Sequence, residues 1–168
     1  MLYVQSSWSR SLIIFTFFTL SLLATPLAAG ASGEGIITKK SDFGVTKTLD
    51  RLAIALERKG IKVFARIDHA KGAKSVGMEL EPTAVMIFGT PKIGTPLMQS
   101  NPAIGIDLPL KALAWREQDG SVMLAYTDPM WLAKRYGIEN RDKVFKTMTG
   151  ALNKFTDMAT KRGALPKQ

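Results

Sequence analysis

The sequence has no cysteine and only one histidine, and these two shortages exclude several kinds of chemistry. Without cysteine there is no disulfide, no thiolate nucleophile and no cysteine-ligated zinc site. Zinc and copper centres need several nitrogen or sulfur ligands, so we expect no metal site around the single histidine, His69. Phosphate-binding loops, dinucleotide fingerprints, nucleophile elbows and paired-carboxylate motifs are also missing, and we assign no cofactor and no catalytic residue.

Acidic residues are few as well. The chain has 14 Asp and Glu against 23 Lys and Arg, a formal net charge of +9. The basic residues are scattered along the chain, without the clustering and the aromatic companions that are typical of nucleic-acid binding. We interpret them as a solvated basic surface and expect no nucleic-acid partner. The length of 168 residues, with 46% apolar residues, is enough for one globular domain with a core.

The chain has one long apolar run near its N-terminus, which covers residues 12–24 and follows Arg10. A basic residue, an apolar stretch and then small residues form the pattern of a secretory signal peptide. We expect residues 1–31 to be this signal, cleaved after Ala29 or Ala31, and residues 32–168 to form a periplasmic or secreted domain without a membrane span. The alternative is an uncleaved anchor, although a spanning helix needs about twenty apolar residues.

Two stretches, 45–56 and 144–159, have apolar residues at helical spacing, and each predicts an amphipathic helix. The expected N-caps are Ser41 or Asp42 for the first helix, Asn140 for the last, and Asp128, followed by Pro129, for a short helix between them.

Strands are predicted over 35–39, 61–67, 84–88, 108–117 and 121–126. In the second strand, Ile61, Val63, Ala65 and Ile67 alternate with other residues and should share one face of the sheet. The third strand is apolar on both faces, as expected of a central strand. The sequence therefore predicts a single α+β domain of order β-α-β(4)-α, with helices packed on an antiparallel sheet and a core from about residue 40 to 160.

A long connection follows the third strand, and we expect a functional site around it. Residues 90–99 contain two prolines, a glycine and two threonines and are interpreted as a loop. Because successive antiparallel strands reverse direction, this loop and the neighbouring strand ends should meet at one edge of the sheet. The predicted ligand-binding residues are Gly89, Thr90, Pro91, Lys92, Gly94, Thr95, Asp107, Lys111, Tyr126 and Asp128.

Several of these residues also have a simpler, structural interpretation. Asp128 before Pro129 is most simply a helix cap, and Asp107 and Lys111, four residues apart on a strand, are a modest surface pair. His69 belongs to the opposite edge, and a lone histidine in a turn is more often a hydrogen-bonded structural group than a ligand or catalyst.

Three motifs occur in order along most of the chain, and together they resemble the prokaryotic family known as domain of unknown function 302, or DUF302. The motifs are Ile87–Met98, Asp107–Lys111 and Tyr126–Pro129. The resemblance implies a β-α-β4-α fold similar to that of TATA-binding-protein-like domains, and small domains that associate in pairs. It implies no activity. This chain has Thr90 and Thr127 where the family motif has asparagine.

We rank a non-enzymatic binding module first among three functions. It would be an exported domain, expected as a homodimer, that holds a small or anionic ligand near the loop. Backbone amides of residues 89–95, the hydroxyls of the two threonines in the loop, Lys92 and Lys111 would be the donors.

Two alternatives remain. The first is a structural or protein-interaction homodimer in which Leu97 and Met98 form an apolar dimer contact. The second is a hydrolase or isomerase that uses Asp107, Asp128 or His69 as acid or base.

Overall fold

The computed structural model describes residues 33–164, so the predicted signal segment lies outside the described residues. Five strands form one antiparallel sheet in the order β1-β5-β4-β3-β2. The strands are β1 (Ile36–Ser41), β2 (Lys62–Asp68), β3 (Thr83–Gly89), β4 (Leu110–Arg116) and β5 (Val122–Thr127). The predicted α+β class and the antiparallel sheet are confirmed.

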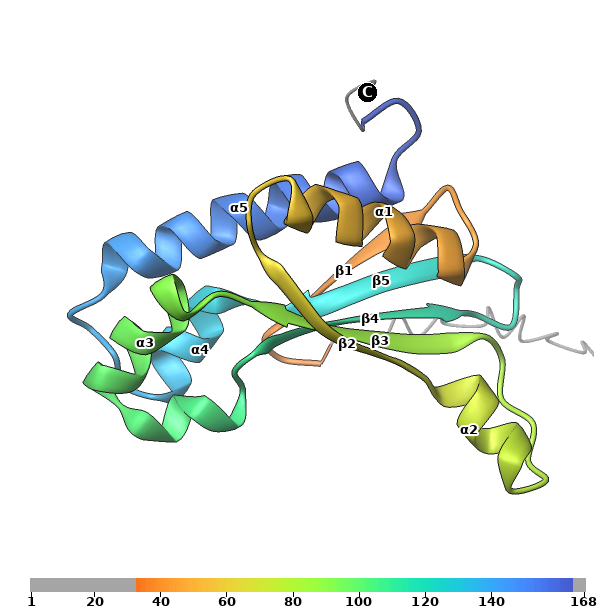
Figure 1. Ribbon diagram of the computed structural model, residues 1–168, viewed down its shortest axis with the longest axis horizontal. Coiled ribbons are helices and arrows are strands. Elements are labelled where there is room, and N and C mark those ends of the chain that lie inside the picture. The colour runs from red at the N-terminus through yellow and green to blue at the C-terminus, as the bar shows by residue number, and fades with distance from the viewer. Residues whose placement is uncertain (1–32, 165–168) are drawn as a thin grey trace, which may run out of the picture.

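Helices cover one face of this sheet (Figure 1). The helices are α1 (Val45–Glu57), α2 (His69–Ser75), α3 (Pro91–Ser100), the 3-10 helix η1 (Pro102–Ile106), α4 (Pro129–Arg135) and α5 (Asp142–Thr160). Helices α1 and α5 lie side by side on the sheet, and the N-terminal half of α5 extends beyond the end of α1 towards α3 and α4. Helix α2 lies at the opposite end, between β2 and β3. Among residues 33–164, no helix is both long enough and apolar enough to span a bilayer.

The main core lies between the sheet and the pair α1 and α5. Alternate residues of the strands face the helices because side chains on a strand alternate between the two faces. Thus Ala84, Met86 and Phe88 of β3 are buried, whereas Val85 and Ile87 lie half-buried on the face that the helices leave uncovered. A second, smaller core forms where α3, η1 and α4 meet the start of α5, around Leu97, Ile104, Leu132, Ile138, Phe145 and Met148.

The predicted caps were right for one helix and wrong for two. Asp128 caps α4 and accepts a hydrogen bond from the amide of Met130 at 2.9 Å. The N-cap position of α1 is Gly44, not Ser41 or Asp42. Ser41 is buried and hydrogen-bonded to Thr48, and the Asp42 carboxylate accepts a hydrogen bond from the Arg162 amide at 2.9 Å. The N-cap position of α5 is Arg141, without a side-chain cap, so Asn140 does not cap it either.

A bulge in β2 changes which of its residues share a face. Val63 pairs with Phe88, but after the bulge Ala65 pairs with Ile87, which points to the other face. Val63 therefore faces the helices and Ala65 and Ile67 do not, contrary to the prediction of a common face. A bulge adds one residue to a strand and shifts the alternation by one, which a regular period-two pattern does not reveal.

The predicted loop over residues 90–99 is wrong, since Pro91–Ser100 forms α3. Pro91 occupies the first turn, where a helix needs no amide donor, and Thr90 before it is extended. Pro96 lies inside the helix, where it removes one backbone hydrogen bond. The fully buried Leu97 anchors α3 in the second core, and this packing outweighs the poor helix propensity of the stretch.

Candidate functional site

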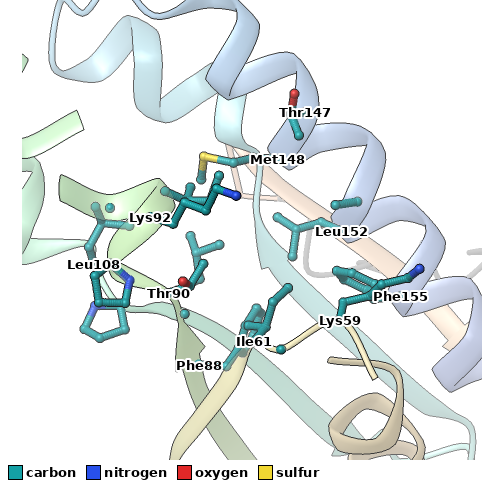
Figure 2. A pocket seen from close by; sticks show the side chains of 18 of the residues that line it. Lys59, Ile61, Phe88, Thr90, Lys92, Leu108, Thr147, Met148, Leu152 and Phe155 are labelled. Atoms are coloured by element: carbon teal, nitrogen blue, oxygen red, sulfur yellow. The ribbon is translucent and has the colours of Figure 1, made fainter. Parts of the chain in front are cut away.

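An apolar cleft with a cavity volume of about 1090 Å³ opens on the helix face of the sheet, beyond the end of α1 (Figure 2). Its floor is formed by Phe88 and Leu110, at the end of β3 and the start of β4. Helix α5 forms one wall, and the start of β2 and helix α3 form the others. The apolar lining from these walls consists of Ile61, Phe64, Ile93, Met98, Leu108, Met148, Ala151, Leu152 and Phe155.

Local sequence explains why these side chains meet. Met148, Leu152 and Phe155 are spaced by four and three residues, so they lie on one stripe of α5. The bulge in β2 places Phe64 beside the cleft, although it lies on an edge strand. Gly89 lies at this corner, and a Cβ there would meet the Pro109 side chain at 3.5 Å and the Phe64 ring at 3.7 Å, both ordinary van der Waals distances.

Charge at the cleft is of one sign. Four lysines line it, Lys59, Lys92, Lys146 and Lys154, and no aspartate, glutamate or histidine does. Figure 2 shows Lys92 extending from α3 towards α5 and Lys59 lying alongside Phe155. None of the four forms an ion pair with a carboxylate of residues 33–164. The cleft therefore combines an apolar interior with a rim of four lysines and no acidic lining residue.

Six of the ten predicted site residues line the cleft: Gly89, Thr90, Pro91, Lys92, Gly94 and Thr95. They do so from the end of β3 and the first turns of α3. The amides of Ile93 and Gly94 both donate to the Thr90 carbonyl at 3.1 Å, so these two predicted donors are used within the helix.

Asp107 and Lys111 lie outside the cleft. The Tyr136 hydroxyl donates to the Asp107 carboxylate at 2.6 Å, and Arg135 lies 3.6 Å from the same oxygen. The hydrogen bond to Asp107 raises the pKa of Tyr136. The Lys111 ammonium donates to the backbone carbonyl of Asp107 at 3.3 Å, rather than pairing with its carboxylate as predicted. This cluster ties the start of β4 to α4.

The other predicted residues are also elsewhere. Tyr126 is 5% exposed in the main core, and this burial raises the pKa of its hydroxyl. Asp128 is the cap of α4, and His69 begins α2, at the far end of the sheet. Leu97, predicted as part of a dimer contact, is fully buried in the second core. Within residues 33–164, no three His, Asp or Glu side chains gather as metal ligands would.

Several lining residues were missed by the sequence analysis. Met148, Leu152 and Phe155 belong to a stripe that the periodicity identifies, but a stripe of this kind equally describes core. Lys146 and Lys154 lie beside that stripe, eight residues apart in the sequence. This pair of lysines was the signal by which the α5 wall of the cleft could have been found from the sequence.

The conserved-domain profile described as "Domain of unknown function DUF302" matches residues 37–155. The chain belongs to the DUF302 family. Its fold is similar to that in the crystal structure of the uncharacterized conserved protein DUF302 from Bacillus stearothermophilus, with a TM-score of 0.68 and 17% sequence identity. The likeness covers 76% of this chain and 99% of that one. The resemblance seen in the motifs, and the fold that it implies, are thus confirmed.

Curated relatives of this DUF302 protein come from Brucella. The proteins named "Fluoride-specific ion channel FluC 1" in Brucella suis biovar 1 (strain 1330) and Brucella abortus biovar 1 (strain 9-941) are both 41% identical to it over 134 residues. The match covers 77% of this chain but 53% and 50% of those proteins. This chain therefore spans about half the length of the relatives that it matches.

Proposed function

We propose that this DUF302 protein is a non-enzymatic binding module, exported from the cell, that holds a small and largely apolar molecule in the cleft. The observation that supports this is the cleft itself. Its volume of about 1090 Å³ is close to that of known ligand pockets, which span roughly 300–1,000 Å³ and are mostly apolar. Burial of apolar ligand surface against such a lining is favourable by roughly 25 cal/mol per Å².

The positions of the acidic residues favour a binding role over acid–base catalysis. Asp107 is held by Tyr136 and Arg135, and Asp128 caps a helix. His69 lies at the other end of the sheet. A general acid or base must reach the reacting group, and none of these three side chains lines the cleft.

We propose further that fluoride is not the ligand of this cleft. The name of the Brucella relatives describes proteins of which this chain matches about half, so the name does not assign that activity to the matched half. Fluoride is a small and strongly hydrated anion, and an apolar lining offers little to replace its water shell. Titration of the protein with fluoride should accordingly give no binding at the cleft.

The proposal is tested by filling the cleft. Ala151 on α5 and Thr95 on α3 both line it, and neither is fully buried. Ala151→Phe and Thr95→Trp each place a bulky side chain in the ligand volume from a different wall. Gln99→Trp on α3 is the matched control, since Gln99 is exposed and lies outside the lining.

Nile red, an uncharged dye that fluoresces in apolar surroundings, is the probe. The full chain and the control should enhance its fluorescence, and both filled variants should lose most of that enhancement while keeping a cooperative thermal transition. Two variants are used so that one remains informative if the other does not fold. Equal enhancement in all folded variants would contradict a ligand site in the cleft.

A further inference from the structure

We propose that the natural ligand is a single-chain amphiphile with an anionic head group, an inference that rests on the binding function proposed above. The chain of the amphiphile would lie along the apolar lining, and its carboxylate or phosphate would lie at the lysine rim. The juxtaposition of the two features carries the inference. An apolar site alone suits many neutral molecules, and scattered surface lysines alone suit none in particular.

The rim of the cleft carries positive charge only. Lys59 comes from the turn after α1, Lys92 from α3, and Lys146 and Lys154 from α5, and all four line one opening. Like charges gathered around a low-dielectric cleft repel one another and raise the local concentration of anions. None of the four forms an ion pair with a carboxylate of residues 33–164, so an anionic head group would not have to displace one.

The shape of the lining favours an extended chain. The lining runs along α5 from Lys146 to Phe155, which at 1.5 Å per residue is about 14 Å of helix. Its apolar side chains are leucine, isoleucine, methionine, phenylalanine, alanine and proline, and its polar side chains are confined to lysines and threonines. A small inorganic anion would leave this apolar volume unused. A flexible aliphatic chain fills it, and methionines such as Met98 and Met148 adapt to such chains.

Lys92 and Lys59 are the strongest candidates to contact the head group. Figure 2 shows the Lys92 side chain reaching across the cleft towards Met148, and Lys59 lying on the other side near Phe155. Both are exposed at the rim, so glutamine in their place removes charge without disturbing the core. Lys134 on α4 is the matched control, because it is an exposed lysine outside the lining.

The test compares decanoate, decyl phosphate and decanol, which share one chain and differ in head group, by calorimetric titration of the full chain at low salt. We expect the anions to bind about tenfold more tightly than the alcohol. Lys59→Gln combined with Lys92→Gln should remove most of this difference and leave decanol binding unchanged, whereas Lys134→Gln should change neither. Lys92→Gln alone should remove part of it. Raising the salt concentration should weaken the anions but not the alcohol.

The outcomes separate the two proposals. If none of the three compounds binds, the proposed binding function itself is wrong. If all three bind equally, and the lysine variants change nothing, the cleft is a ligand site but the anionic head group is wrong. Tighter binding of either anion, lost in the lysine variants, supports the inference, and the tighter of the two identifies the head group.

Discussion

Replacing Arg51 with methionine should destabilise this protein more than any other exchange of a surface-accessible basic residue. The Arg51 guanidinium, on α1, reaches the end of α5 and donates to the carbonyls of Met158, Ala159 and Lys161 at 2.7, 3.1 and 2.8 Å. It also stacks 4.2 Å from the centre of the Phe43 ring. One side chain therefore joins the two helices that cover the sheet.

The magnitude follows from these contacts. A buried hydrogen bond from a charged donor contributes about 1.5–3 kcal/mol to the free energy of unfolding. Because the Arg51 bonds are partly exposed, we take about 1 kcal/mol for each. The cation–π contact adds about 0.5–1 kcal/mol, and a cation at a helix C-terminus is favourable as well. Because such terms are not additive, we expect Arg51→Met to lower the free energy of unfolding by about 2–4 kcal/mol.

Arg51→Lys sharpens the prediction. Lysine keeps the charge but lacks the planar fork that reaches three carbonyls together, so it should restore less than half of the loss. Urea unfolding at equilibrium measures both variants, with an unchanged m-value as the sign that the native fold persists. Lys134→Met, at an exposed side chain that forms no ion pair within residues 33–164, should stay within about 0.5 kcal/mol of the wild type. A loss below about 1 kcal/mol for Arg51→Met, or full recovery with lysine, would refute the reasoning.

Two further predictions concern α5. Gly150 lies in the middle of this helix, where an added Cβ would contact nothing within 4 Å. Gly150→Ala should therefore raise the free energy of unfolding, measured by thermal or urea denaturation, by about 0.5–1 kcal/mol. A decrease would contradict the helix geometry. The hydrogen bond from Lys39 at 2.9 Å lowers the pKa of Asp157. A carboxylate whose pKa is lower in the folded state than in the unfolded state stabilises the protein at pH values above the unfolded-state pKa. This stabilisation is lost as the pH falls through the folded-state pKa. Asp157→Asn should therefore flatten the acid side of a stability–pH curve below about pH 4, and an unaltered curve would exclude this contribution.

The two main helices and the interior strand β3 were predictable because local patterning and tertiary packing agree there. Helix α3 was not, since two prolines and a glycine signal a loop, and only the burial of Leu97 in the second core makes the stretch helical. The bulge that places Phe64 at the cleft adds a single residue and leaves no periodic trace.

Only one side of the candidate cleft was predicted from the sequence, because only that side has an unusual local pattern. Residues 89–95 were found because their composition is unusual, whatever their conformation. The opposite wall, on α5, has the ordinary pattern of a core helix, and the cleft opens where α1 has ended and the N-terminal half of α5 continues beyond it. Asp107 and Tyr126 were expected at the site from the order of strand ends, but side-chain direction takes both elsewhere.

The central claim is that the cleft holds a ligand, and native mass spectrometry of the protein purified from its own cell, without refolding, tests it most directly. We predict a stoichiometric adduct on the wild type, with the mass of a single-chain amphiphile, which is absent from Ala151→Phe and retained by Gln99→Trp. A bare protein mass for the wild type, or the same adduct on the filled variant, would contradict the account.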